Sequence, residues 1–167
     1  TQSVSMLQLT ACIYTQRMTS PTWQLPTYRQ IDKTFVALNL RRATRSLSNM
    51  YEEIMRPSGL RVTQFSVLVA IQNTGPVTMS VLAKVLAMDR TTLTRNLKPL
   101  VRDGLLIITP GEDPRSRVVN LSEKGIEQLE EAIPLWQKAQ DAVDNKLADG
   151  QLDDILKTLN SLARINK

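Results

Sequence analysis

A short basic segment between residues 90 and 102 holds side chains that can bond to nucleic-acid bases and phosphates. It reads RTTLTRNLKPLVR and contains no acidic residue. If Leu93, Leu97 and Leu100 face a protein core, the side chains left at the surface are Arg90, Thr91, Thr92, Thr94, Arg95 and Lys98. Arginine pairs with guanine through two hydrogen bonds, and threonine offers base edges a hydroxyl and a methyl group. The pattern predicts a DNA-reading helix. The competing interpretation is an ordinary solvated helix face, although such faces usually mix charges of both signs.

The segment DPRSR, residues 113–117, is a second candidate contact. An arginine on a projecting loop can enter the DNA minor groove, where the narrow walls strengthen the negative potential. Arg115 and Arg117 are therefore candidate DNA-binding residues. Asp113 is better suited to orient an arginine through a charge-assisted hydrogen bond than to touch DNA itself. A solvated turn of the usual Asp-Pro type is the alternative.

Three short helices and a hairpin are expected to position these residues. Apolar residues recur at helical spacing over residues 64–73, 79–87 and 90–103. The predicted N-caps are Thr63, Thr78 and Asp89, with Gly104 as the stop of the third helix. In the middle helix we expect inward side chains at Leu82, Ala83, Val85 and Leu86. Two β-prone runs, residues 105–109 and 117–121, enclose turn residues and predict a β-hairpin.

Longer amphipathic helices are expected at both ends of the chain. Residues 32–56 carry a narrow apolar seam, with Asp32 as the predicted N-cap. Residues 122–148 carry a near-heptad seam that begins after the cap Ser122 and is interrupted at Gln140, and a further amphipathic helix follows. These seams exceed what three short helices and a hairpin can cover. They predict packing against a second copy of the chain, with a self-contained helical bundle as the alternative.

The composition excludes several kinds of site. The chain has no histidine and a single cysteine, Cys12. Nucleophilic sites that need histidine, histidine-ligated zinc, disulfide frameworks and clusters held by several thiolates are therefore ruled out. Adjacent acidic residues such as Glu52 and Glu53 point to different sides of a helix, and no Gly-rich phosphate loop is present. We expect neither an enzyme nor a cofactor or metal site.

Charge and length favour one DNA-binding domain with a helical extension. The 167 residues include 21 Lys or Arg and 16 Asp or Glu, a net charge of +5. The positive charge lies in residues 1–117, whereas residues 118–167 carry six basic and nine acidic side chains. A basic face suits a polyanionic partner such as double-stranded DNA. No run reads as a membrane span or a signal peptide, so we expect a cytoplasmic protein with no membrane partner.

Together the elements predict a mainly α fold with a small β-hairpin wing, an α+β arrangement. Two short helices followed by a hairpin make a winged helix-turn-helix, with dimerisation helices at the N- and C-terminal ends. The expected divisions are an irregular N-terminal arm over residues 1–31, a helical dimerisation region formed by residues 32–56 and 122–167, and a DNA-binding domain over residues 57–121.

From about residue 38 to residue 142 the sequence resembles the MarR-type (multiple-antibiotic-resistance regulator) transcriptional regulators. The matching pieces are GLRVTQFSVLVAIQNTGPVTMSVLAKVLAMDRTTLTRNLKPLVRDGLL and the wing DPRSRVVNLSEKG. The wing fits the family pattern of Asp-x-Arg, five residues and Leu-Ser at Asp113, Arg115, Leu121 and Ser122. The resemblance implies a homodimeric repressor on pseudo-palindromic operator DNA, released by a small, often phenolic ligand or by cysteine oxidation. It also implies that Thr94 and Arg95 read the major groove, that Arg115 enters the minor groove and that Asp113 steadies the wing.

Three alternatives concern the effector and the function. An effector pocket is expected between the first two helices and the DNA-reading lobe. The candidates for its lining are Met50, Tyr51, Ile54, Phe65 and Leu68, but residues of these types are more often simply part of the core, so none is assigned to a site. Cys12 has no adjacent cation to favour a reactive thiolate, so we expect an inert thiol, with a redox-sensing regulator as one alternative function. The other is a winged-helix protein-interaction module that does not read DNA directly.

Overall fold

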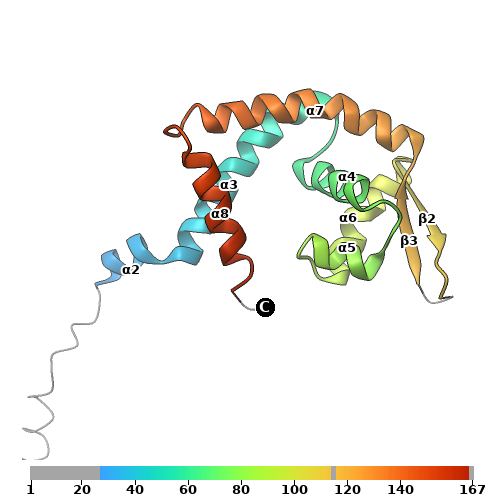
Figure 1. The fold of residues 1–167 in the computed structure, drawn as a ribbon, viewed down its shortest axis with the longest axis horizontal. Helices are drawn as coiled ribbons and strands as arrows, with labels where there is room; N and C mark the ends of the chain where they lie inside the picture. Colours follow the sequence, from blue (N-terminus) through green and yellow to red (C-terminus); the bar gives the residue numbers. More distant parts are fainter. Residues whose placement is uncertain (1–26, 114–115, 166–167) are drawn as a thin grey trace, which may run out of the picture. The chain divides into compact units, whose positions relative to one another are not determined.

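The structure, a computed structural model, describes residues 27–113 and 116–165 (Figure 1). The chain divides into two compact units, residues 1–43 and 44–167. Cys12 and Arg115, which the sequence singles out, lie outside the described residues.

The described part of the first unit contains α2 (Tyr28–Thr34) and the start of α3 (Val36–Met55). The hydroxyl of Thr27 accepts a hydrogen bond from the Gln30 amide at 3.3 Å, and the Gln30 side-chain oxygen accepts one from the Thr27 amide at 2.7 Å. This reciprocal capping box fixes the start of α2. The prediction of an irregular arm is therefore wrong for residues 28–31, where the Thr-x-x-Gln capping box starts a helix.

Asp32 does not cap the long helix, contrary to the prediction. It lies within α2, where its carboxylate forms an ion pair with Arg42 at 2.9 Å. The helix predicted over residues 32–56 is interrupted at Phe35, whose backbone is extended at φ −73° and ψ 97°. The Asn39 side-chain amide donates to the Lys33 carbonyl at 3.2 Å and to the Asp32 carbonyl at 3.3 Å. These bonds satisfy carbonyl groups that the end of α2 leaves without helical partners.

The second unit is a winged helix-turn-helix, which confirms the predicted fold class. After the end of α3 its elements are η1 (Arg56–Ser58), α4 (Val62–Thr74), β1 (Val77–Thr78), α5 (Met79–Val85), α6 (Arg90–Arg102), β2 (Leu106–Pro110), β3 (Arg117–Leu121), α7 (Glu123–Asp144) and α8 (Gln151–Leu162). The predicted hairpin strands are present, and a third strand joins them. The sheet is antiparallel with the order β1-β3-β2, and Val77 lies opposite Val119.

Side-chain caps start several of these helices at their predicted positions. The oxygens of Thr78, Asp89 and Ser122 accept hydrogen bonds from backbone amides three residues later. Thr63 was wrongly predicted as the cap of α4. That helix begins at Val62, two residues before the predicted start, because the Glu52 carboxylate of α3 accepts the Val62 amide at 3.0 Å and the Gln64 side chain accepts the Arg61 amide at 2.9 Å.

The core of the second unit lies between α4, α6, the sheet and α7. Leu93, Leu97 and Leu100 are buried, as predicted, together with Leu68 of α4 and Val119 of β3.

Val85 is 52% exposed, although the sequence predicts that it faces inward. The helix α5 ends at Val85, two residues before the predicted end, and Ala87 has a left-handed φ of 51°. Val85 instead borders an open hollow together with Phe65 and Trp136, which leaves its side chain accessible to solvent.

Hydrogen bonds join the residues that follow α6 to the start of α7. The Ser122 hydroxyl donates to the Gly104 carbonyl at 2.6 Å, and the Ser122 amide donates to the Leu105 carbonyl at 3.1 Å. Gly125 of α7 lies against Leu105, the residue that precedes β2. A Cβ atom on Gly125 would meet the Leu105 carbonyl oxygen at 2.1 Å. A residue without a side chain is needed there.

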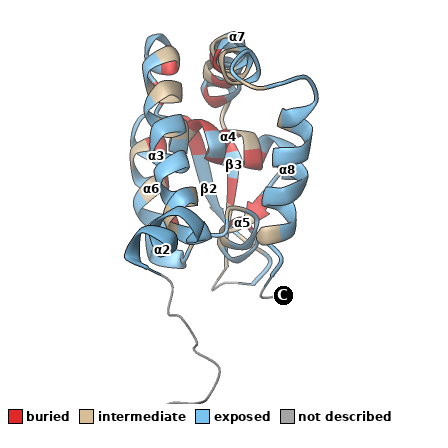
Figure 2. Ribbon diagram, turned by 90° about the vertical axis from the view of Figure 1, so that its left-hand side faces the viewer, coloured by how far each residue is buried: buried red, intermediate tan, exposed pale blue. Residues whose placement is uncertain are grey.

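The last helix, α8, differs from the rest of the second unit because none of its residues is buried (Figure 2). Of the helices in residues 27–113 and 116–165, none combines the length and the apolar character that a bilayer crossing requires.

Gly125→Ala should destabilise the protein. Alanine normally stabilises a helix relative to glycine, but here the added methyl group collides with backbone, so we expect a loss of about 1–3 kcal/mol in the free energy of unfolding. Urea unfolding followed by circular dichroism measures it. Glu127→Ala, at an exposed position of the same helix, is the control and should change little. Unchanged or increased stability of Gly125→Ala would contradict the close packing of α7 on Leu105.

Candidate nucleic-acid interface

The orientation of α6 is set by its buried leucines and its N-terminal cap. Leu93, Leu97 and Leu100 are at most 2% exposed, so the opposite face of the helix points outward. Asp89 accepts the Thr92 amide at 2.8 Å and the Thr92 hydroxyl at 2.6 Å. The Thr92 hydroxyl and amide hydrogen bonds hold the pKa of Asp89 below its usual value, because they stabilise the carboxylate. The Asp89 carboxylate is therefore negatively charged at neutral pH. This charge interacts favourably with the positive N-terminal end of the helix dipole.

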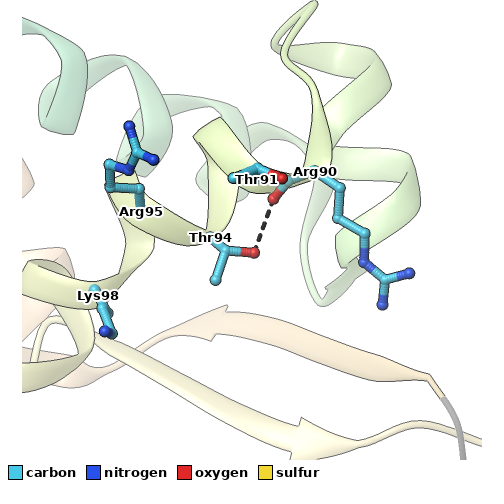
Figure 3. Close-up of a pocket in the computed structure, with 5 residues that line it drawn as sticks. All are labelled: Arg90, Thr91, Thr94, Arg95 and Lys98. Atoms are coloured by element: carbon cyan, nitrogen blue, oxygen red, sulfur yellow. Dashed lines mark hydrogen bonds between the residues drawn. The ribbon is translucent and has the colours of Figure 1, made fainter.

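The outward face of α6 borders an open hollow of about 460 Å³, which we call the α6 hollow. Its lining consists of Arg90, Thr91, Thr94, Arg95 and Lys98. Figure 3 shows Arg90 and Arg95 extending to opposite sides of Thr94, with the hairpin strands beside them. Five of the six residues predicted on this face thus line one surface. The sixth, Thr92, is exposed but turned to the cap through its bond to Asp89.

The cations of the α6 hollow have no acidic partner in the part of the chain that the structure describes. Within residues 27–113 and 116–165, neither Arg90 nor Arg95 nor Lys98 forms an ion pair. By contrast Arg102, at the end of the same helix, pairs with Asp103 at 2.9 Å. Basic side chains without internal partners are available to an external anion, and an exposed helix face of this kind suits the major groove of DNA.

The two strands of the hairpin, β2 and β3, pair up to the start of the connecting segment. Pro110 lies opposite Arg117 at its base, and the Ser116 amide donates to the Asp113 carbonyl at 2.8 Å. Arg117 and Asp113 are both exposed. The position of Arg115 lies outside the described residues, so its contact with DNA and the orienting role of Asp113 stay predictions.

A second hollow, of about 590 Å³, lies between α4, the end of α5 and α7, and we call it the α4–α7 hollow. It is lined by Phe65, Ser66, Val69, Ala70, Asn73, Val85, Leu86, Ile133 and Trp136. The rings of Phe65 and Trp136 are stacked with centroids 6.4 Å apart. Its lining is mainly apolar and aromatic, with two polar side chains, a composition typical of small-molecule sites.

Only one of the five residues suggested by sequence lines this hollow. Phe65 does so, whereas Leu68 is part of the core. Tyr51 instead donates a hydrogen bond to the Gln140 side-chain oxygen at 2.5 Å, which joins α3 to α7, and burial raises the pKa of its phenol. That bond also explains why Gln140 interrupts the apolar seam of α7. Ile133 and Trp136 were missed because they belong to a seam that the sequence assigns to dimerisation.

No cluster of acidic or thiol side chains suited to a metal ion occurs among the described residues. The described residues instead offer cations and hydroxyls that can bind an anionic partner, and an apolar hollow that can bind a small molecule.

Comparison with known proteins agrees with the geometry. The MarR family matches residues 58–116. The transcriptional regulator MosR of Mycobacterium tuberculosis, solved in complex with DNA, is 39% identical; the match covers 77% of this chain and 95% of MosR with a TM-score of 0.68. An uncharacterised helix-turn-helix regulator of Bacillus subtilis, YwoH, is 29% identical over 55% of this chain and 67% of its own length.

BpsR of Bordetella bronchiseptica, solved in a study of how 6-hydroxynicotinic acid regulates its DNA binding, shares the fold at 24% identity and a TM-score of 0.70. The match covers 77% of this chain and 98% of that one. The named relatives are regulators, not enzymes. The match to the family, the close relationship to MosR and the winged helix built around α6 together show that this chain belongs to the MarR family of transcriptional regulators.

Proposed function

We propose that the protein binds double-stranded DNA in a sequence-specific way, with α6 in the major groove and the hairpin beside the minor groove. The observation that carries the proposal is the outward face of α6, where Arg90, Arg95 and Lys98 have no acidic partner within the described residues. In this arrangement Arg95 reads a base, Arg90 and Lys98 contact phosphates, and Arg115 and Arg117 follow the minor groove. MosR, whose structure was determined with DNA, supports the proposal as a relative.

Arg95→Ala should weaken binding by about 1–3 kcal/mol per subunit and reduce discrimination between operator and scrambled DNA, because a base contact is lost. The duplex is one enriched by the wild-type protein from random-sequence DNA, and binding is measured by fluorescence anisotropy. Arg102→Ala is the matched control, since it removes the same charge from the same helix at a residue already paired with Asp103.

Salt dependence separates this proposal from a protein-interaction module. If about 6–10 phosphates are contacted, affinity should fall about 10³–10⁵-fold between 50 and 200 mM salt. Absence of DNA binding, or equal losses in Arg95→Ala and Arg102→Ala, would contradict the reading role of α6.

We propose further that the protein acts as a homodimer. The apolar residues Ile155, Leu156 and Leu159 of α8 are 37–45% exposed, although they form a stripe at helical spacing. Leu47 of α3 is also 42% exposed. A second copy would cover these surfaces. Two subunits would also place two copies of α6 about one turn of DNA apart, as a pseudo-palindromic operator requires.

Leu156→Arg should shift the protein from dimer to monomer, because a charge is placed in the centre of the apolar stripe. Sedimentation velocity measures the change. Thr158→Arg adds the same charge at an exposed neighbouring position of α8 and should leave the dimer intact. A wild-type monomer, or a dimer that persists in Leu156→Arg, would contradict a dimer formed through α8.

The regulatory part of the proposal is a repressor that a small phenolic ligand releases from DNA. The α4–α7 hollow supports it, because aromatic side chains line a space of ligand size and Ser66 and Asn73 offer polar groups. The ligand class follows from the family resemblance. The cysteine-based alternative rests on Cys12, which lies outside the described residues.

Salicylate, as a phenolic probe, should change the fluorescence of Trp136 with saturation and release bound DNA. The measurement uses a Trp23→Phe background, since these two are the only tryptophans in the chain. Val69→Phe should fill the hollow and abolish the response, because Val69 lines it. Val81→Phe, at an exposed position of α5 outside the lining, is the control. A response that survives Val69→Phe would place the ligand elsewhere.

A further inference from the structure

The three threonines at the start of α6 differ in what they can offer to DNA. Each hydroxyl has one hydrogen to donate. The Thr92 hydroxyl donates to the Asp89 carboxylate at 2.6 Å, and the Thr94 hydroxyl donates to the Arg90 carbonyl at 2.8 Å. Thr91 makes no side-chain hydrogen bond to any described residue. Thr91 therefore keeps a free donor, Thr92 positions the helix start, and Thr94 presents a different surface.

What Thr94 presents is its methyl group. Its hydroxyl is turned back to the carbonyl one helical turn earlier, as Figure 3 shows, and the methyl carbon lies on the other side of the residue. Thr94 lines the α6 hollow between Arg90 and Arg95. It also lines a smaller, largely apolar hollow of about 170 Å³, shared with Leu97, Val101 and Ile108. The centre of the cationic face is thus an apolar spot.

We infer that Thr94 is a specificity-determining residue that recognises the C5-methyl group of a thymine through its own methyl group. The inference rests on the proposed function and deepens it. In the major groove only thymine presents a methyl group, whereas the other bases present hydrogen-bond donors and acceptors. Arg90 and Arg95, on either side of Thr94, would bind the DNA backbone or the flanking bases. The methyl contact of Thr94 would then distinguish one base pair in each half-site.

The size of the effect follows from the burial of one methyl group. Burying a methyl-sized apolar group gives about 0.8 kcal/mol, which corresponds to about fourfold in affinity. Removing the thymine methyl at the contacted position of one half-site should weaken binding about fourfold, and removing it from both half-sites should weaken binding about 15-fold.

The test replaces thymine by deoxyuridine, which lacks only that methyl group, at each position of the enriched duplex in turn. The quantity measured at each position is the ratio of the dissociation constants for the uracil and thymine duplexes. For the wild type we expect one symmetric pair of positions with a ratio near four. Thr94→Ser keeps the hydroxyl and loses the methyl group, and its ratio at that pair should fall to one.

Two further variants control for the Thr94 hydroxyl and for the loss of a threonine methyl group elsewhere in the chain. Thr94→Val keeps the methyl group and loses the hydroxyl, so its ratio at the same pair should stay near four. Thr158→Ser removes the same methyl group from a threonine of α8 whose hydroxyl also donates to the carbonyl one helical turn earlier, so it should leave the ratio of the wild type.

The outcomes separate the two claims. If no duplex is enriched and no DNA is bound, the proposed function fails. If DNA is bound but the ratio is one at every position, or does not change in Thr94→Ser, the methyl contact is wrong while the proposed function stands. If Thr94→Val loses discrimination as Thr94→Ser does, the hydroxyl reads the base and the inference is overturned.

Discussion

The burial of Leu93, Leu97 and Leu100 in one stripe is the constraint on which the rest of this structure depends. Because these three side chains occupy the core, the rotation of α6 about its axis is fixed, and its basic and hydroxyl side chains must face outward. A different rotation would bury Arg90, Arg95 or Lys98 without partners, at a large cost in desolvation. Packing of apolar side chains thereby decides which residues are available for recognition.

The contacts at both ends of α6 hold that orientation. At its start Asp89 bonds to Thr92 through two hydrogen bonds. At its end the Ser122 hydroxyl bonds to the Gly104 carbonyl, and the Lys124 ammonium donates to the Asp103 carbonyl at 2.9 Å. The strand that follows α6 is therefore coupled to α7. Since α7 also lines the α4–α7 hollow, a ligand bound there would act on the same helix that supports α6 and the hairpin.

Features encoded by local spacing were predictable, and features that depend on tertiary contact were not. The caps Asp89 and Ser122 and the leucine stripe of α6 could be predicted because each rests on residues three or four apart. The start of α4 depends on Glu52, ten residues earlier, and β1 exists only through its pairing with β3. Trp136 lines the α4–α7 hollow because α7 packs on α4, which a reading of either helix alone does not reveal.

The candidate interface divides in the same way. The sequence predicted the outward face of α6 correctly, because helical spacing fixes it. It did not distinguish the threonines, although the bond from Thr94 to the Arg90 carbonyl spans four residues and the bond from Thr92 to Asp89 spans three. These are local hydrogen bonds, and the types and spacing of the residues allow them. Spacing alone does not decide which hydroxyl forms such a bond, because the side-chain rotamer does.

The most direct measurement is a titration of the isotope-labelled protein with the enriched duplex, followed by amide chemical shifts in nuclear magnetic resonance spectra. The account predicts that the largest changes fall on residues 90–98 and on the hairpin around residues 110–117. Changes confined to α8 or to the surface of α7, with the amides of α6 unaffected, would contradict it.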